Sequence, residues 1–149
     1  MKLPSWSTLP DIGLYMDQVV TLMERTFGAM PGAGGLTRSM VNNYVKAGLI
    51  RRPVGKRYDR DQLAQLIMIA VLKQALSMEE IARVLAILCE EGVESGYARF
   101  GAEALAQPAA QSDSAVSSAI QAAVLVIRAK RLIAELGPGS AEYSRHPGA

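Results

Sequence analysis

The segment Leu36-Thr-Arg-Ser-Met-Val-Asn-Asn-Tyr-Val-Lys-Ala-Gly-Leu-Ile50 continues directly into Arg51-Arg-Pro-Val-Gly-Lys-Arg-Tyr58, and together they form the most informative pattern of the chain. Thr37 is suited to cap a helix and Gly48 to end it, so about ten helical residues are expected between them. The pattern therefore predicts a short amphipathic helix that runs into a basic turn.

The basic turn has the composition of a small wing. Leu49–Arg52 and Lys56–Tyr58 could pair as two very short strands around Pro53-Val-Gly55, which would give a minimal two-strand wing. Residues 36–60 hold seven Lys or Arg side chains against one Asp, a net charge of +6, whereas the whole chain carries only +2. Such a concentrated positive patch is typical of a phosphate-binding surface, although a solvated basic face would look similar.

The polar side of the short helix carries side chains that can read a DNA groove. At about 100° per residue, these side chains fall within an arc of roughly 140°. They are Arg38, Ser39, Asn42, Asn43 and Lys46. Arg can bond guanine, Asn can bond adenine, and Lys and Ser reach phosphates. The arc contains no acidic residue, so the pattern favours contact with the major groove over an ordinary surface helix.

Composition limits the classes of protein that the chain can represent. Of its 149 residues, 50% are hydrophobic, which is enough for one packed domain. The single cysteine, Cys89, excludes an internal disulfide and a zinc site with several thiolates. The N-terminal residues lack the apolar stretch of a signal peptide, and the most apolar runs are too short to span a bilayer. We expect a soluble cytoplasmic protein without a membrane segment.

Helical spacing recurs along the whole chain and strand-like alternation is nearly absent, so a mostly α fold is expected. Helices are predicted from Asp11 to about Phe27, from Asp59 or Asp61 to about Ala75, from Ser77 to Gly92, and finally from Ser114 to about Leu136. The Ser77-Met-Glu-Glu80 sequence matches a capping box, whereas Glu94–Ala110 is only weakly helical. A Gly-rich link, 28–35, separates the first helix from the next.

The chain is expected to divide into three regions. Residues 1–92 would form a winged helix-turn-helix DNA-binding domain, 93–136 a C-terminal helical region for dimerisation or packing, and 137–149 a flexible tail. Nearly every residue from Ala119 to Ile127 is apolar, too many for one face of a helix in a small monomer. We therefore expect a homodimer, whose two recognition helices would read half-sites roughly 34 Å apart in a palindromic operator.

The short helix, the basic turn and the helix starts that follow them resemble the winged helix-turn-helix of the mercury-resistance-regulator, or MerR, superfamily. The likeness covers about residues 36–88. It rests on Thr37, Tyr44, Gly48-Leu49, Arg57-Tyr58, Asp61 and Leu76-Ser-Met-Glu-Glu-Ile81. The chain resembles an uncharacterised bacterial family, known only as a domain of unknown function, more closely than it resembles MerR. There an Asp-Ile-Gly-Leu-Tyr-Met-Asp-Gln opening, as at Asp11–Gln18, precedes Met-Val-Asn-Asn-Tyr-Val-Lys.

The MerR resemblance implies roles for particular side chains. Arg38, Ser39 and Asn42 would face the groove, Tyr44 and Lys46 the DNA backbone, and the wing would contact flanking phosphates. With Asn43 from the polar arc and the capping Thr37, the expected DNA-binding residues are Thr37, Arg38, Ser39, Asn42, Asn43, Tyr44, Lys46, Arg51, Arg52, Lys56, Arg57 and Tyr58. For Tyr58, packing on the core is the favoured alternative to a phosphate contact. The sequence departs from the MerR pattern at Asn42 and Asn43, in the long Gly-rich link, and in lacking a long heptad-patterned helix or a cysteine cluster.

Two other functions compete with DNA binding. An enzyme is disfavoured because the only histidine, His146, lies in the tail, no phosphate-binding loop is present, and no carboxylate cluster has metal-ligand spacing. No cofactor or metal is expected, and a small-molecule effector has no support. A protein-protein adaptor or phage-type architectural module on the same scaffold is the serious alternative, because the C-terminal half is apolar. We expect a sequence-specific bacterial transcription regulator that binds double-stranded DNA.

Overall fold

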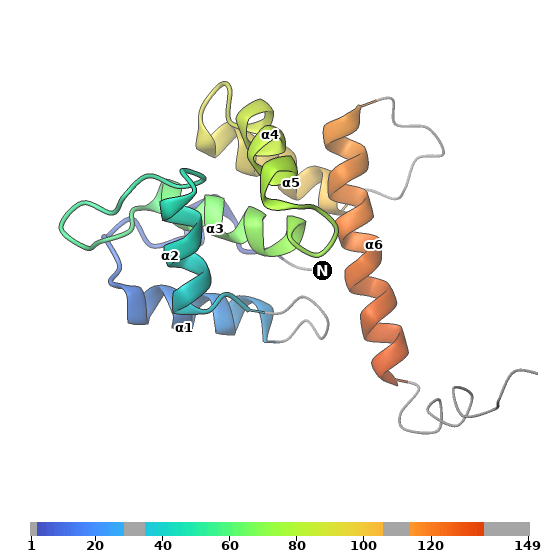
Figure 1. Ribbon diagram of the computed structural model, residues 1–149, viewed down its shortest axis with the longest axis horizontal. Coiled ribbons are helices and arrows are strands. Elements are labelled where there is room, and N and C mark those ends of the chain that lie inside the picture. The colour runs from blue at the N-terminus through green and yellow to red at the C-terminus, as the bar shows by residue number, and fades with distance from the viewer. Residues whose placement is uncertain (1–2, 29–34, 106–113, 136–149) are drawn as a thin grey trace, which may run out of the picture.

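The computed structural model describes residues 3–28, 35–105 and 114–135 and shows an α-helical protein (Figure 1). Its elements are a 3-10 helix η1 (Trp6–Thr8) and the helices α1 (Met16–Phe27), α2 (Arg38–Lys46), α3 (Arg60–Leu72), α4 (Met78–Leu88), α5 (Val93–Leu105) and α6 (Ala115–Glu135). A mostly α chain is therefore confirmed. Residues 29–34 of the Gly-rich link, residues 106–110 of the weakly helical stretch and the tail with His146 lie outside the described residues.

Helix α3 lies at the centre of the core because it is apolar around most of its circumference. Ten of its 13 residues are buried, and α4, α5 and α6 pack against it. Its one buried polar side chain, Gln62, is satisfied: its Oε1 accepts from the Asp59 amide at 2.8 Å and its Nε2 donates to the Arg51 carbonyl at 3.0 Å. This last bond ties the basic loop to the first turn of α3.

The helix starts that depend on local side-chain caps agree with the sequence. Thr37 Oγ1 accepts from the Met40 amide at 3.2 Å and begins α2, and Gly48, with φ of 78°, follows its end. Asp59, the first of the two predicted caps, accepts from the Gln62 amide at 2.9 Å. Ser77 and Glu80 form the predicted capping box of α4. Each of these hydrogen bonds joins residues three positions apart, so it forms without tertiary contacts.

The two-strand wing is wrong. Within the described ranges no strand or sheet forms, and the one bridge that joins two residues of the loop 47–59 is isolated, between Val54 and Arg57. Gly55 and Lys56 have φ of 58° and 62°, and the Arg57 amide donates to the Val54 carbonyl at 3.0 Å, as in a type I′ turn. The expected winged helix-turn-helix is therefore replaced by a helical domain with a tight basic turn.

The backbone that was expected to complete the wing pairs with the N-terminal segment instead. The Leu14 amide donates to the Tyr58 carbonyl at 2.9 Å, and the Tyr58 amide donates to the Leu14 carbonyl at 2.8 Å. Leu14 must be extended to make this bridge, so α1 begins at Met16 and not at Asp11. The loop is thus held at its far end by residues more than forty positions earlier.

The C-terminal half is more helical than the sequence indicates. Residues 93–105 form the regular helix α5, which crosses α4 closely because Gly96 meets the Leu88 carbonyl where a Cβ would stand 2.5 Å from its oxygen. Helix α6 packs through Val116, Ile120 and Ala123, one side of its first half. Its second half projects away from the other helices in Figure 1. In the described portion, no helix is long and apolar enough to cross a membrane.

Candidate nucleic-acid interface

Helix α2 separates an apolar side from a polar side. Val41 and Tyr44 are buried in the core, with Tyr44 only 6% exposed. The opposite side is exposed and carries Arg38, Ser39, Asn42, Asn43 and Lys46. The structure therefore brings together on one surface all five polar side chains of the predicted groove-reading arc, while Tyr44 points into the protein.

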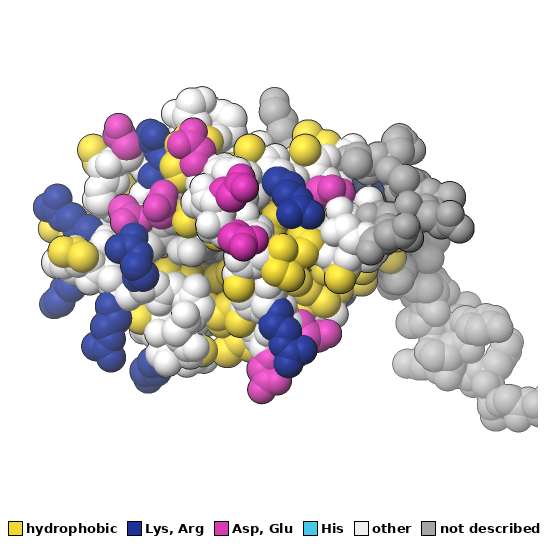
Figure 2. Space-filling model, turned by 90° about the horizontal axis from the view of Figure 1, so that it is seen from above, with side chains coloured by type: hydrophobic (Ala, Val, Ile, Leu, Met, Phe, Trp, Pro, Cys, Tyr) yellow, Lys and Arg dark blue, Asp and Glu magenta, His cyan; other side chains and the backbone are white. Residues whose placement is uncertain are grey.

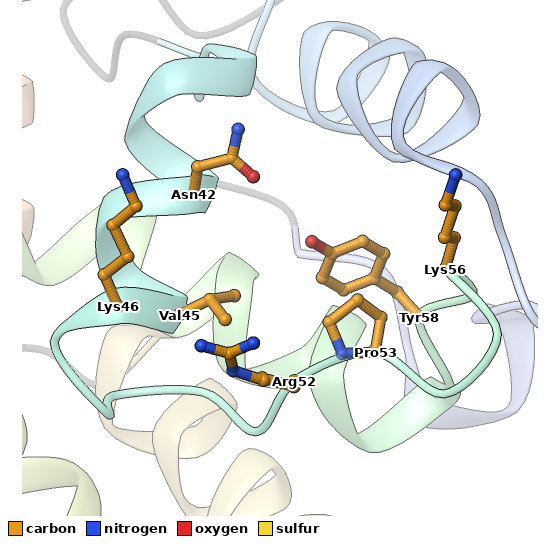
Figure 3. A pocket seen from close by; sticks show the side chains of 7 residues that line it. All are labelled: Asn42, Val45, Lys46, Arg52, Pro53, Lys56 and Tyr58. Atoms are coloured by element: carbon orange, nitrogen blue, oxygen red, sulfur yellow. The ribbon is translucent and has the colours of Figure 1, made fainter.

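A hollow lies between α2 and the basic loop (Figure 3). Its volume is about 360 Å³. The side chains that line it are Asn42, Val45 and Lys46 from α2 and Arg52, Pro53, Lys56 and Tyr58 from the loop. Three of these are cations and none is an acid. The hollow therefore offers donors from two elements to a single anionic group.

The seven cations of residues 36–60 divide by their contacts. Across the described parts of the chain, no hydrogen bond or ion pair holds Lys46, Arg52 or Lys56. All three are exposed, and all three line the hollow. We call Lys46, Arg52 and Lys56 the cation triplet. Because no described side chain neutralises its charges, the triplet is the part of the described surface most available to an external anion.

The other four cations have partners within the protein. Arg38 is bonded to Asp17 of α1, and Arg51 donates to Asp59 at 2.8 Å. Arg57 donates to the Tyr15 hydroxyl, and Arg60 donates to the Leu9 carbonyl at 3.1 Å and stacks over Trp6. The pairs of Arg38 and Arg51 are solvent-exposed, so each is worth about 0–1 kcal/mol and a phosphate could displace the carboxylate.

The hydroxyl side chains of the predicted site differ in their hydrogen bonds and in their burial. Thr37 is engaged as the cap of α2 and Ser39 is exposed beside it. Burial raises the pKa of both Tyr44 and Tyr58 above the ordinary value of 10.0. Tyr58 is 3% exposed and still lines the hollow, where its hydroxyl points toward α2 in Figure 3. A phenol that stays protonated can act only as a donor to an anion, so Tyr58 suits both packing and anion contact.

Basic side chains gather at one end of the molecule. Figure 2 shows Lys and Arg along the margin that carries the loop 47–59, whereas acidic side chains are more frequent over the middle of that face. The first turn of α4 supplies Glu79 and Glu80, and the link to α5 supplies Glu90 and Glu91. This separation of charge would orient the protein with its basic end toward a polyanion.

Sequence reasoning missed two residues of this surface, Tyr15 and Asp17. Both belong to the first turn of α1 or its cap, and both are exposed. Tyr15 binds Arg57 and Asp17 binds Arg38, so each sets the position of a predicted DNA-binding cation. No local pattern could have found them, because 42 and 21 positions separate the partners.

Two further features of the part of the chain that the structure covers concern metal ligands and the cysteine. There, no group of three or more His, Cys, Asp or Glu side chains could hold a metal ion. Cys89 is half-buried, and burial followed by the charge of Asp61 raises the pKa of its thiol above 9.0. A thiol with a raised pKa is a poor nucleophile at neutral pH.

Comparisons with known proteins identify the family of the chain. Neither the curated proteins nor the solved structures include a match. One family model, described as a domain of unknown function, DUF1836, matches residues 4–100. The matched range covers η1, α1 to α4 and most of α5, and it contains the cation triplet. Because the match spans more than half of the chain, the protein belongs to the DUF1836 family.

Proposed function

We propose that this protein binds double-stranded DNA and regulates transcription, with α2 in the major groove and the loop 47–59 on the flanking backbone. The observation that carries the proposal is the cation triplet. Lys46, Arg52 and Lys56 have no described partner, face one hollow, and adjoin the acid-free polar side of α2. DNA presents closely spaced phosphates beside base edges, which is the pattern of groups that this surface can satisfy.

The dimensions of α2 support this placement. Nine helical residues are roughly 14 Å long, and the major groove, about 12 Å wide, admits a helix. With Val41 and Tyr44 anchored in the core, Asn42 and Asn43 can approach base edges while Lys46 remains at the phosphate edge. The likeness of Thr37, Tyr44 and Gly48-Leu49 to the motifs of MerR regulators points to the same use of the helix.

Fluorescence anisotropy tests the proposal on labelled random and upstream genomic duplexes across roughly 50–200 mM salt. The test variant replaces the triplet: Lys46→Ala, Arg52→Ala and Lys56→Ala. The matched control removes three exposed cations from α1, α4 and α5: Arg25→Ala, Arg83→Ala and Arg99→Ala. Both variants lose three positive charges, so they differ only in where the charge was lost.

We expect the triplet variant to lower the slope of log affinity against log salt by about two to three, because each phosphate contact contributes about 0.9. The control variant should keep the slope of the wild-type protein. Equal losses in both variants would mean that net charge alone attracts DNA. Absence of wild-type binding at low salt would reject the proposal and favour the protein-protein adaptor.

We also propose that the protein is a homodimer that pairs through α6. Leu125 and Leu132 are 46% and 50% exposed and lie seven residues apart, on the same side of the helix. Light scattering measures this directly, since a dimer has twice the 16.0 kDa mass of one chain. A monomer in solution and on DNA would reject the dimer without affecting the proposed DNA interface.

A further inference from the structure

The outer side of the basic loop carries an arginine that faces away from the hollow. Lys56 and Tyr58 line the hollow, whereas Arg57, between them, contacts Tyr15 at the start of α1. The loop therefore presents donors on two flanks, one toward α2 and one toward α1.

Arg57 is held at this outer flank by three interactions with one tyrosine. Its Nε and Nη2 donate to the Tyr15 hydroxyl oxygen at 3.1 and 2.9 Å, and its guanidinium carbon lies 4.9 Å from the centre of the Tyr15 ring. The paired backbones of Leu14 and Tyr58 fix the two side chains next to each other. Side-chain freedom that is normally lost on binding is thus already reduced in the free protein.

The Tyr15 hydroxyl keeps one function that Arg57 does not use. Its oxygen accepts both guanidinium bonds, so its own hydrogen must point away and remains a donor. The remaining N–H groups of Arg57 lie beside it. Tyr15 is 48% exposed, so solvent or a ligand reaches this hydroxyl. A phosphate can accept from the phenol and the guanidinium together, and such hydrogen bonds polarise and strengthen one another.

We infer that Tyr15 and Arg57 form a second phosphate-binding site on the outer flank of the loop, which holds a backbone phosphate of the DNA whose other contacts are made by α2 and the cation triplet. This inference rests on the proposed DNA-binding function. Arg57 supplies charge, and Tyr15 both orients Arg57 and donates to the phosphate. The nearest acid of α1, Asp17, is engaged by Arg38, which offsets its repulsion of the phosphate.

Tyr15→Phe tests the site because it removes the hydroxyl and retains the ring under the guanidinium. The affinity of Tyr15→Phe for the same labelled duplex is compared with the affinities of the wild type, of Arg57→Ala and of the double variant that carries both changes. Tyr97→Phe is the matched control, since it removes a phenol hydroxyl from α5 that bonds to the Pro4 carbonyl and not to the loop. The thermal unfolding midpoint of every variant is measured alongside.

We expect Tyr15→Phe to weaken DNA binding about three- to tenfold, the range for one lost hydrogen bond, with an unchanged salt slope. Arg57→Ala should lower the slope by about one, and Tyr15→Phe should add less than twofold in that background. Tyr97→Phe should bind DNA as the wild type does, although its midpoint falls.

Each contrary result identifies the claim that fails. If the wild type binds DNA and Tyr15→Phe has the same DNA affinity, the outer phosphate site alone is overturned. Additive losses in the double variant overturn the pairing of Tyr15 with Arg57, and a loss of affinity that follows a lowered unfolding midpoint assigns Tyr15 a purely structural role. A wild-type protein that does not bind DNA overturns the proposed function and this inference together.

Discussion

At the scale of single residues, Lys56 combines backbone strain with an available charge. It is the one described non-glycine residue with positive φ, at 62°, a conformation that costs a side-chain-bearing residue roughly 1–2 kcal/mol. Its ammonium group belongs to the cation triplet. Strain of this kind persists where the surrounding structure imposes it, often at functional sites.

Lys56→Gly should therefore separate stability from binding. We expect the free energy of unfolding to rise by about 0.5–1 kcal/mol, because glycine relieves the strain but gains freedom in the unfolded chain. DNA affinity should fall and the salt slope should decrease by about one. Chemical denaturation and anisotropy measure the two effects, and Lys56→Ala is the control that loses the charge without relieving the strain. Equal stabilities of the two variants would contradict the role of strain.

Asp17 is expected to oppose DNA binding, since its carboxylate occupies Arg38. Asp17→Asn should raise DNA affinity about two- to fivefold, because it frees the arginine and removes a charge that a nearby phosphate would repel. Stability should change little, as exposed ion pairs contribute about 0–1 kcal/mol. Anisotropy beside Glu24→Gln, a neutralisation elsewhere on α1, measures the effect. Equal gains in both variants would show that only net charge matters.

At the scale of elements, the capping box of α4 makes a prediction about pH. The Ser77 amide, donating to Glu80 at 2.9 Å, and then the Ser77 hydroxyl lower the pKa of Glu80 below its ordinary value of 4.5. A carboxyl whose pKa is lower in the folded state stabilises the fold fully above pH 4.5, and the contribution disappears as the pH falls through the lowered value. Glu80→Gln should remove this part of the acid sensitivity while keeping a cap acceptor. The test compares the unfolding midpoints of the wild type and of Glu80→Gln between about pH 3 and 6. The same dependence on pH in both proteins would contradict the prediction.

The elements that the sequence predicts well are those with local signals. Thr37, Asp59 and Ser77 each accept a hydrogen bond from an amide three positions later, so their patterns are complete within one turn of chain. The prediction of a wing was wrong because a strand needs a partner strand. No pattern within residues 49–58 indicates which segment of the backbone that partner is. Tyr58 pairs with Leu14, a choice made by tertiary packing.

The same distinction applies to the candidate site. Composition and helical spacing were enough to place the polar arc of α2 on one surface and to mark the loop as basic. They could not show that Arg38, Arg51 and Arg57 already have partners, whereas Lys46 and Arg52 have none among the described residues. That difference depends on where α1 docks, and it decides which charges an anion meets unneutralised.

At the scale of the whole molecule, α6 has two apolar sides, but the described residues cover only one of them. Val116, Ile120, Ala123 and Ile127 pack on the rest of the protein. On another side, Ala122, Leu125, Ala129 and Leu132 are exposed at spacings of three, four and three residues. This spacing is that of a coiled-coil seam. An isolated helical segment shorter than about 12–15 residues is only marginally stable in water. The projecting half of the 21-residue helix α6 is shorter than this, so a partner would stabilise it.

If the partner is a second copy, the double variant Leu125→Ser and Leu132→Ser should convert a dimer into a 16.0 kDa monomer, measured by light scattering. The control is Met78→Ser with Ile87→Ser, which removes two exposed apolar side chains from α4 and should leave the dimer intact.

Dimerisation also joins two basic ends, so the monomeric variant should show roughly half the salt slope of the wild type on duplexes long enough for two half-sites about 34 Å apart. On a duplex that holds one half-site, the two proteins should bind alike, because each α2 and loop is unchanged. A monomeric variant that retains the full slope on the long duplex would show that two chains bind DNA independently, and α6 would then face a different partner.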